Sequence, residues 1–237
     1  NTRMSVPEIP ANLRYMTATN IVSDTYGISF DVDADGKDGI YAENYNSATP
    51  REHVKFSVKA SIPGAFNAYN LMASITAVSS VTGLSFEDVA SRVSTLAPIK
   101  GRMTVINEGQ PFEVIIDYAH TPSSFETIFP PLRKRCSGKI FSVFGSGGER
   151  DVTKRPLQGQ IAAKYCDVVV LADEDPRGED PVELLKQIAA GAEKEGKIMD
   201  KDLFIIHERQ KAIREVFKMA QKGDIVLLLG KSHENSI

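Results

Sequence analysis

The spacing of apolar residues changes character near Pro98, which divides the chain into two parts. In the first part, segments rich in Ile, Val, Tyr, Phe and Thr are separated by Gly, Asp and Pro, a pattern typical of strands. The expected strands are residues 18–31, 39–46 and 53–60. Apolar residues then recur at helical spacing, which predicts helices at residues 66–81 and 86–96, the second capped by Ser85.

The part after Pro98 alternates strands with helices. The expected strands are residues 112–118, 139–144, 167–172, 203–207 and 224–229. The expected helices are residues 123–135, 156–165, 181–195 and 209–220. The inner strands are continuous apolar runs, which suit a parallel sheet covered on both faces. We therefore predict an α/β protein with a doubly wound, Rossmann-like sheet in residues 101–237, joined by a linker at residues 97–101 to a separate domain in residues 1–100.

Composition sets limits on function. Of the 237 residues, 42% are hydrophobic and 25% are charged, as in an ordinary globular protein. The net charge of −3 gives no reason to expect a nucleic-acid partner, and no apolar run approaches the roughly 20 residues that span a bilayer. Residues 1–10 lack a signal segment, and Cys136 and Cys166 have no metal spacing. We expect a monomeric cytoplasmic protein with two structural thiols and, because Asn1 is not Met, a fragment.

Two segments resemble known ligand motifs but do not complete them. Residues 31–36 match the opening of a calcium loop, yet position twelve is Ala42 rather than Glu, so a turn between strands is expected instead. Residues 230–232 resemble the end of a phosphate-binding P-loop, but the first glycine of that motif would fall at Ile225, inside a strand. No metal site is expected in this chain.

Four polar loops leave the carboxyl ends of the predicted parallel strands. They are residues 117–122, 145–155, 173–181 and 230–237, and they hold an unusual density of Asp, Arg, His, Lys and Gly. In an open parallel sheet, ligands bind beyond the carboxyl ends of the strands. The sequence therefore predicts a ligand site formed by these loops.

Several residues suit a nucleotide. Asn67 and Asn70 lie three residues apart, on one face of a predicted helix near its start. A side-chain amide both donates and accepts hydrogen bonds, which suits the edge of an adenine. The alternative is that Asn67 caps the helix. Arg102 could pack on a purine or reach a phosphate, or form a surface salt bridge. Asp117, followed by His120, is placed for ribose hydroxyls, with helix capping as the alternative.

The glycine-rich loop at residues 144–156 suits an anion. Glycines after a strand let backbone amides face a negative charge, Pro156 suits the first position of a helix, and Lys154 and Arg155 add positive charge. The following loop is acidic, with Arg177 embedded in it. It suits a molecule that carries both ammonium and carboxylate groups, with Arg177 bonding the carboxylate; a structural ion pair and a helix start capped by Asp180 are the alternatives.

Taken in order, these segments resemble the central and C-terminal domains of the Mur ligase family, most nearly its MurE type. The matching segments are Gly-Ala-Phe-Asn-Ala-Tyr-Asn at 64–70, Gly-Arg-Met at 101–103, Asp-Tyr-Ala-His-Thr-Pro at 117–122, the glycine-rich loop at 144–156, Glu-Asp-Pro-Arg at 174–177 and Gly-Lys-Ser-His-Glu at 230–234. The resemblance implies part of an α/β central domain followed by the C-terminal Rossmann-like domain.

The resemblance also implies an activity and a role for each site residue. With ATP and Mg²⁺, the MurE type adds the third amino acid to UDP-MurNAc-L-Ala-D-Glu through an acyl phosphate. The residues expected to meet the adenosine of ATP are Asn67, Asn70, Arg102 and Asp117, with His120 close to them. Those expected to hold the incoming amino acid are Arg150, Glu174, Asp175, Pro176, Arg177, Gly230 and Glu234. These are substrate-positioning roles, and no catalytic residue is assigned.

The chain departs from the family pattern in several places. The family's UDP-binding domain, its P-loop and the carbamylated lysine that helps bind magnesium are absent, so the chain alone is expected to be inactive. Ser232 stands where the family has Gly, and Asp175 where diaminopimelate-adding members have Asn. Arg177 favours diaminopimelate, whereas Asp175 favours a distal ammonium, as in lysine. Another amide ligase, such as a folylpolyglutamate synthase, and a non-catalytic nucleotide-binding module are the alternative functions.

Overall fold

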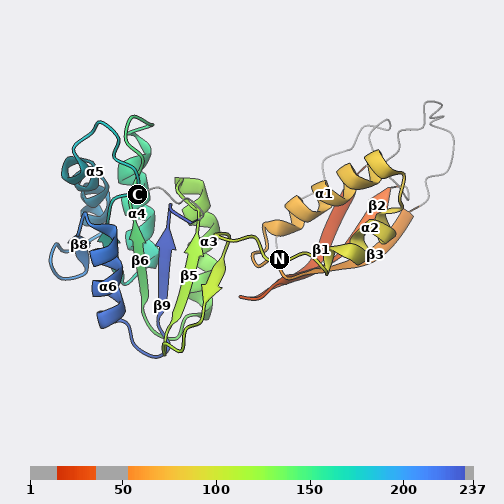
Figure 1. Ribbon diagram of the computed structural model, residues 1–237, viewed down its shortest axis with the longest axis horizontal. Helices are drawn as coiled ribbons and strands as arrows, with labels where there is room; N and C mark the ends of the chain where they lie inside the picture. Colours follow the sequence, from red (N-terminus) through yellow and green to blue (C-terminus); the bar gives the residue numbers. More distant parts are fainter. Residues whose placement is uncertain (1–14, 36–52, 233–237) are drawn as a thin grey trace. The chain divides into compact units, whose positions relative to one another are not determined.

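The computed structural model describes residues 15–35 and 53–232. The chain divides into two compact units, Asn1–Pro98 and Ile99–Ile237, which are described separately below (Figure 1). No helix in the described ranges is long and apolar enough to cross a membrane.

The first unit has a three-stranded antiparallel sheet in the order β1-β2-β3, followed by two helices. The elements are β1 (Met16–Ser23), β2 (Ile28–Asp35), β3 (His53–Ala60), α1 (Asn67–Thr82) and α2 (Phe86–Val93). The prediction of one strand over residues 18–31 is wrong, because the chain reverses between β1 and β2. The Oδ1 atom of Asp24 accepts hydrogen bonds from the amides of Tyr26 (2.7 Å) and Gly27 (2.9 Å), which makes the turn.

The predicted cap of α2 is confirmed, whereas the expectations for residues 31–46 are not. Ser85 caps α2 as predicted, since its Oγ accepts a hydrogen bond from the amide of Asp88 at 3.1 Å. The expected strand at residues 39–46 lies outside the described residues. Residues 31–35, the described part of the segment that resembles the opening of a calcium loop, lie in β2, so the turn expected there is wrong for these residues.

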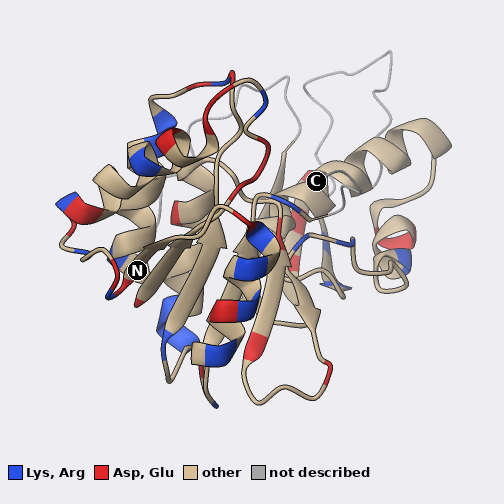
Figure 2. Cartoon of the chain, turned by 60° about the vertical axis from the view of Figure 1, so that its left-hand side comes forward, with Lys and Arg blue, Asp and Glu red and all other residues tan. Residues whose placement is uncertain are grey.

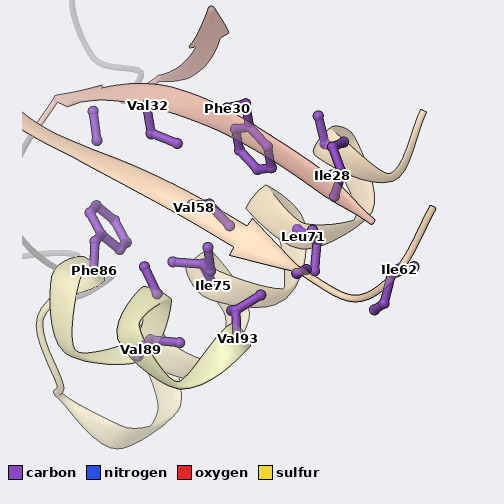
Figure 3. Packing of buried hydrophobic residues seen from close by; sticks show 14 residues of the cluster. Ile28, Phe30, Val32, Val58, Ile62, Leu71, Ile75, Phe86, Val89 and Val93 are labelled. Atoms are coloured by element: carbon purple, nitrogen blue, oxygen red, sulfur yellow. The ribbon is translucent and has the colours of Figure 1, made fainter. Parts of the chain in front are cut away.

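The core of the first unit forms between the sheet and the two helices. Alternate residues of β2 and β3 point to one face, as the two-residue period of a strand requires. Figure 3 shows the residues that meet there: Ile28, Phe30, Val32 and Val58 from the sheet, Leu71 and Ile75 from α1, and Phe86, Val89 and Val93 from α2. All of these side chains are buried, so this part of the chain has an apolar core of its own.

The second unit confirms the predicted doubly wound α/β fold. Its six strands lie in the order β4-β5-β9-β6-β7-β8; β4 pairs with β5 in the antiparallel direction, and all other neighbours are parallel. The strands are β4 (Thr104–Ile106), β5 (Glu113–Asp117), β6 (Ile140–Phe144), β7 (Val168–Leu171), β8 (Leu203–Ile205) and β9 (Ile225–Leu229). The short edge strand β4 was not predicted, because three half-buried residues are too few to show a period.

Helices cover both faces of this sheet. They are α3 (Pro122–Arg135), α4 (Lys154–Tyr165), α5 (Pro181–Lys194) and α6 (Arg209–Met219). Val143 of β6 belongs to the core cluster that contains Val216 of α6. Phe144, the next residue, points to the opposite face, where its ring lies 5.0 Å from that of Phe125 in α3.

The start of α4 differs from the prediction. The helix begins at Lys154, so Pro156 is its third residue rather than its first. Proline fits there because the amides of the first turn have no partner within the helix.

Candidate functional site

A cavity of about 540 Å³ lies in the second unit, lined by loops from the carboxyl ends of the central strands. It is lined by Tyr118, His120, Thr121, Gly147, Arg150, Asp151, Lys154, Glu174, Asp175, Arg177 and Lys231. Figure 2 shows acidic and basic residues in the loops at this end of the sheet, as well as along the helices. The lining carries both signs of charge, which suits a ligand with both ammonium and carboxylate groups. The structure thus brings together residues from all four loops that the sequence singled out.

The glycine-rich loop approaches the acidic loop closely. The amide of Gly148 donates a hydrogen bond to the carbonyl of Asp175 at 2.8 Å, and a Cβ at Gly148 would lie 2.0 Å from the carbonyl oxygen of Pro176. The amide of Glu149 donates to the carboxylate of Glu179 at 2.6 Å. Both amides are thus bonded within the protein, so the expectation that the loop presents its amides to an anion does not hold for these two.

Arg155 does not contribute its charge to the cavity, contrary to the prediction. Its side chain is fully buried, and its two terminal nitrogens lie 2.7 Å and 2.8 Å from the two carboxylate oxygens of Glu179. It also donates to Gln187 Oε1 at 2.9 Å and to the carbonyl of Gly147 at 3.3 Å. The hydrogen bonds from Arg155, and then from the amide of Glu149, lower the pKa of Glu179 to about 2.

Lys154, the neighbour of Arg155, does line the cavity. It is half-buried, and its Nζ donates to the carbonyl oxygen of His120 at 3.2 Å. Gln158 Nε2 donates to the same oxygen at 3.0 Å. The first two turns of α4 therefore hold the loop that carries His120 in place.

Asp117 lies at the end of β5 and is buried. Its Oδ2 accepts a hydrogen bond from the amide of Met103, and its Oδ1 accepts one from the amide of Ala119, both at 2.8 Å. Burial raises the pKa of its carboxyl group, while these two amides oppose the shift. Capping of α3 by Asp117 or His120 is excluded, because Thr121 is the cap and its Oγ1 accepts from the amide of Ser124.

Arg102, Tyr118 and His120 form a stack. The guanidinium carbon of Arg102 lies 4.6 Å from the centre of the Tyr118 ring, and the rings of Tyr118 and His120 meet edge to face at 5.0 Å. His120 Nδ1 lies 3.0 Å from the carbonyl oxygen of Tyr118, which fixes the imidazole. Arg102 is exposed, so a cationic and aromatic surface faces outward beside Asp117.

Arg177 is only weakly paired. Its Nε lies 3.4 Å from Asp175 Oδ2, and both side chains are substantially exposed. Two acids that could have neutralised it are engaged elsewhere: Glu179 with Arg155, and Asp180 as the cap of α5, accepting from the amide of Glu183 at 3.0 Å. The capped helix start and an available guanidinium therefore coexist in this loop.

Gly230 brings the last loop against Glu174. It has a positive φ of 85°, and a Cβ there would lie 2.7 Å from Glu174 Oε2. Arg209 supports the end of β9, since its Nη2 donates to the carbonyl of Leu229 at 2.7 Å.

Ser232 lies against Gly101, where an added Cβ would be 2.5 Å from the Ser232 side chain. Glu234 lies outside the described residues.

Asn67 and Asn70 belong to the first unit and are linked to each other. Asn67 is buried and donates through Nδ2 to the carbonyl of Pro63 at 2.6 Å, while its Oδ1 accepts from Asn70 Nδ2 at 2.8 Å. Helix α1 begins at Asn67, so the N-cap position falls on Phe66, which makes no side-chain capping hydrogen bond. The alternative that Asn67 caps the helix is therefore wrong. Asn70 is exposed.

The site contains residues that the sequence reasoning did not assign. Tyr118, Thr121, Asp151 and Lys231 line the cavity, and each lies directly beside a residue that was assigned or within a motif that was quoted. Among the described residues no cluster of His, Cys, Asp or Glu could hold a metal ion.

Comparisons with known proteins agree with the resemblance. Residues 101–232 match the family described as "Mur ligase, glutamate ligase domain". The chain is 55% identical over 186 residues to the UDP-N-acetylmuramyl-tripeptide synthetase of Treponema denticola, over 77% of this chain and 35% of the relative. It is 37% identical over 230 residues to the UDP-N-acetylmuramoyl-L-alanyl-D-glutamate–2,6-diaminopimelate ligase of Geobacillus thermodenitrificans, over 93% of this chain and 44% of the relative.

Solved structures give the same result. A UDP-N-acetylmuramoyl-L-alanyl-D-glutamate–2,6-diaminopimelate ligase matches 93% of this chain and 40% of its own, with 30% identity and a TM-score of 0.52. A folylpolyglutamate synthase of Mycobacterium tuberculosis has a TM-score of 0.66 at 17% identity, over 91% of this chain and 45% of that one, which shows the fold alone. The chain spans less than half the length of each of these relatives. Since the family match extends over more than half of the chain and contains every residue that lines the cavity, this chain belongs to the Mur ligase family.

Proposed function

We propose that this chain is the part of a MurE-type ligase that positions ATP and the incoming amino acid. The full-length enzyme would add the third amino acid, diaminopimelate or lysine, to UDP-MurNAc-L-Ala-D-Glu through an acyl phosphate. The observation that carries the proposal is the cavity of mixed charge within the residues that match the family. The names of the relatives, a tripeptide synthetase and a diaminopimelate ligase, support the choice of reaction.

The charges around the cavity suit an amino acid as ligand. Glu174 and Asp175 would take its ammonium groups, and Arg150 and Arg177 its carboxylates. Charge-assisted hydrogen bonds of this kind are about twice as strong as neutral ones, and arginine adds a planar fork that matches a carboxylate. The long contact between Arg177 and Asp175 leaves the arginine free to exchange this partner for a substrate carboxylate.

The stack of Arg102, Tyr118 and His120 suits the adenosine of ATP. An exposed guanidinium held over an aromatic ring would present a flat face to a purine, and Asp117 at the strand end would meet the ribose. Asn67 and Asn70 are proposed as further nucleotide-binding residues on the ground of the resemblance alone. When bound, ATP supplies the phosphoryl group that activates the terminal carboxylate of the peptide.

This chain would contribute by positioning rather than by proton transfer. Holding the amine of the amino acid against an activated carboxyl group turns an encounter between two molecules into a reaction within one complex, a gain of up to about 7–11 kcal/mol in well-oriented systems. The walls of the cavity come from loops anchored at strand ends, so the substrate groups would be held by a rigid sheet.

The proposal is tested by an amino-acid panel on the full-length enzyme. Phosphate release from ATP is measured with UDP-MurNAc-L-Ala-D-Glu and, in turn, diaminopimelate, lysine and glutamate. Release that requires both the UDP-linked dipeptide and either diaminopimelate or lysine is the expected result. Release with tetrahydrofolate and glutamate would favour a folylpolyglutamate synthase, and nucleotide binding without any release would favour a non-catalytic module. Omitting the dipeptide is the control, because it separates ligation from background ATP hydrolysis.

A further inference from the structure

We propose that the ion pair between the buried Arg155 and the half-buried Glu179 sets the spacing between Arg150 and Arg177, and thereby the affinity for the incoming amino acid. The inference rests on the proposed function, because it assumes that the cavity binds an amino acid. Neither Arg155 nor Glu179 lines the cavity, so both would be positioning residues.

The ion pair joins the two loops that carry the cavity arginines. Arg155 follows the glycine-rich loop with Arg150, and Glu179 lies two residues beyond Arg177 in the acidic loop. The Arg155 side chain has no exposed surface, and its fork meets both carboxylate oxygens of Glu179 at 2.7 Å and 2.8 Å. A bidentate contact of this kind fixes orientation as well as distance, so it holds one loop in a single register against the other.

Further contacts between the same loops depend on that register. The chain forms a parallel bridge between Gly147 and Asp175, and the amide of Gly148 bonds the Asp175 carbonyl at 2.8 Å. Besides the two hydrogen bonds from Arg155, Glu179 accepts a third, from the amide of Glu149, at 2.6 Å. Its carboxylate is thus shared between the buried guanidinium and the residue directly before Arg150.

Two residues of these loops have a strained backbone, which the contacts between the loops must hold in place. Glu149 has a φ of 53° and Arg177 a φ of 50°, a left-handed conformation that side chains other than glycine rarely adopt. Strained residues of this kind persist only where the surrounding structure holds them. One lies directly before Arg150 and the other is the cavity arginine itself. Relaxation of either loop would therefore redirect a guanidinium that faces the cavity.

The first test is Glu179→Gln in the full-length enzyme, with Glu113→Gln as the matched control. Glu113 makes a bidentate pair of the same lengths with the more exposed Arg135, at 2.7 Å and 2.8 Å, at the opposite end of the sheet where β5 begins. We expect Glu179→Gln to raise the KM for the amino acid by about 10- to 100-fold, the scale of a misplacement of about 1 Å. The KM values for ATP and the UDP-linked dipeptide should stay within about twofold, and the control should change none of the three.

A second variant changes the spacing between the same two loops without removing the ion pair. In Gly148→Ala, the added Cβ would lie 2.0 Å from the carbonyl oxygen of Pro176, so the two loops must separate. It should reproduce the selective rise in the amino-acid KM. A purely structural role predicts instead a lower melting temperature and less active enzyme, with all KM values unchanged. That pattern in folded Glu179→Gln and Gly148→Ala would overturn the inference, whereas a wild-type enzyme that ligates no amino acid would overturn the proposed function and the inference together.

Discussion

The carboxylate of Asp117 accepts a hydrogen bond from the backbone amide of Met103 at 2.8 Å, and Met103 has a left-handed φ of 47°. The contact joins the residue at the end of β5 to the segment just before β4. Because left-handed backbone is costly for a residue with a side chain, the bond to Asp117 stabilises a conformation that this segment would otherwise leave. The same contact keeps Arg102 beside the Tyr118 ring.

Asp117→Ala should therefore reduce both stability and nucleotide affinity. The change leaves the amides of Met103 and Ala119 without their acceptor, which should lower the free energy of unfolding by about 1–3 kcal/mol in urea titrations. In the full-length enzyme the KM for ATP should rise while that for the amino acid stays nearly constant. An unchanged KM for ATP in a folded variant would remove Asp117 from the nucleotide site and leave it a purely structural residue.

Glu179 should make the stability of the chain sensitive to acid. Its pKa is lowered to about 2 in the folded protein from an ordinary value of 4.5, so the folded state favours the ionised carboxylate. This contribution is present in full above about pH 4.5, and it is lost as the pH falls toward about 2. Urea unfolding of wild type and Glu179→Gln between pH 2 and pH 6 would test this. Stability should fall less steeply with acid in the variant, and parallel curves would contradict the assignment.

The two cysteines should differ sharply in reactivity. Cys166 is buried, and burial raises the pKa of its thiol to about 12, so almost no thiolate forms near neutral pH. In Cys136→Ser, a thiol reagent should label Cys166 only after unfolding. In Cys166→Ser, the half-buried Cys136 should react in the native chain. Rapid labelling of native Cys136→Ser would show that the core beneath α4 opens readily.

The sequence was most informative where one pattern of apolar residues runs through a whole element. The apolar run of β9 and the alternation of strands and helices around it predicted the second unit almost element by element. The prediction failed where a short polar turn interrupts a long β-rich segment: Asp24 ends β1 by bonding two amides, which no periodicity shows. The edge strand β4 is too short to have a period at all.

Candidate site residues could be predicted as a group but not separated by role. Arg150 and Arg155 lie five residues apart in one basic, glycine-rich segment. Arg155 was expected to add positive charge for an anion, and Arg150 was assigned to the incoming amino acid by the resemblance. Arg155 is buried because Glu179, 24 positions away, meets it inside the protein, and a pairing over that distance has no local signature. The four loops could be placed at one end of the sheet because parallel strands share their carboxyl ends.

Asp175→Asn should change the choice of amino acid. Asn removes one negative charge from the cavity and so leaves Arg177 without the ionic partner that now lies at 3.4 Å. A free Arg177 should bind the distal carboxylate of diaminopimelate better, while the distal ammonium of lysine loses an acidic partner. We therefore expect the ratio of kcat/KM for diaminopimelate over lysine to rise, by roughly 10-fold or more for one charged hydrogen bond. A constant ratio would mean that Asp175 does not contact the distal group.

Arg177 should bind the incoming amino acid although its own backbone is strained. Three variants separate the effect of the side chain on activity from the effect of the strain on stability. Its φ of 50° suits glycine, so Arg177→Gly should be more stable than Arg177→Ala by about 1 kcal/mol in thermal or urea unfolding. Both variants should lose diaminopimelate use, measured as kcat/KM, by roughly 10- to 150-fold, because 1.5–3 kcal/mol is typical for a hydrogen bond to a charged group. Arg177→Lys should recover only part of this activity, since an ammonium cannot form the bidentate fork.

The comparison of the glycine and alanine variants decides between a ligand role and a structural one. If Arg177 contacts the substrate, activity is lost equally in Arg177→Gly and Arg177→Ala although their stabilities differ. If it only holds the loop, through its contact with Asp175, activity should follow stability, and the glycine variant should keep more of it for every amino acid tried. A selective loss for diaminopimelate in the more stable glycine variant cannot come from a weakened fold, because relief of the left-handed strain acts in the opposite direction.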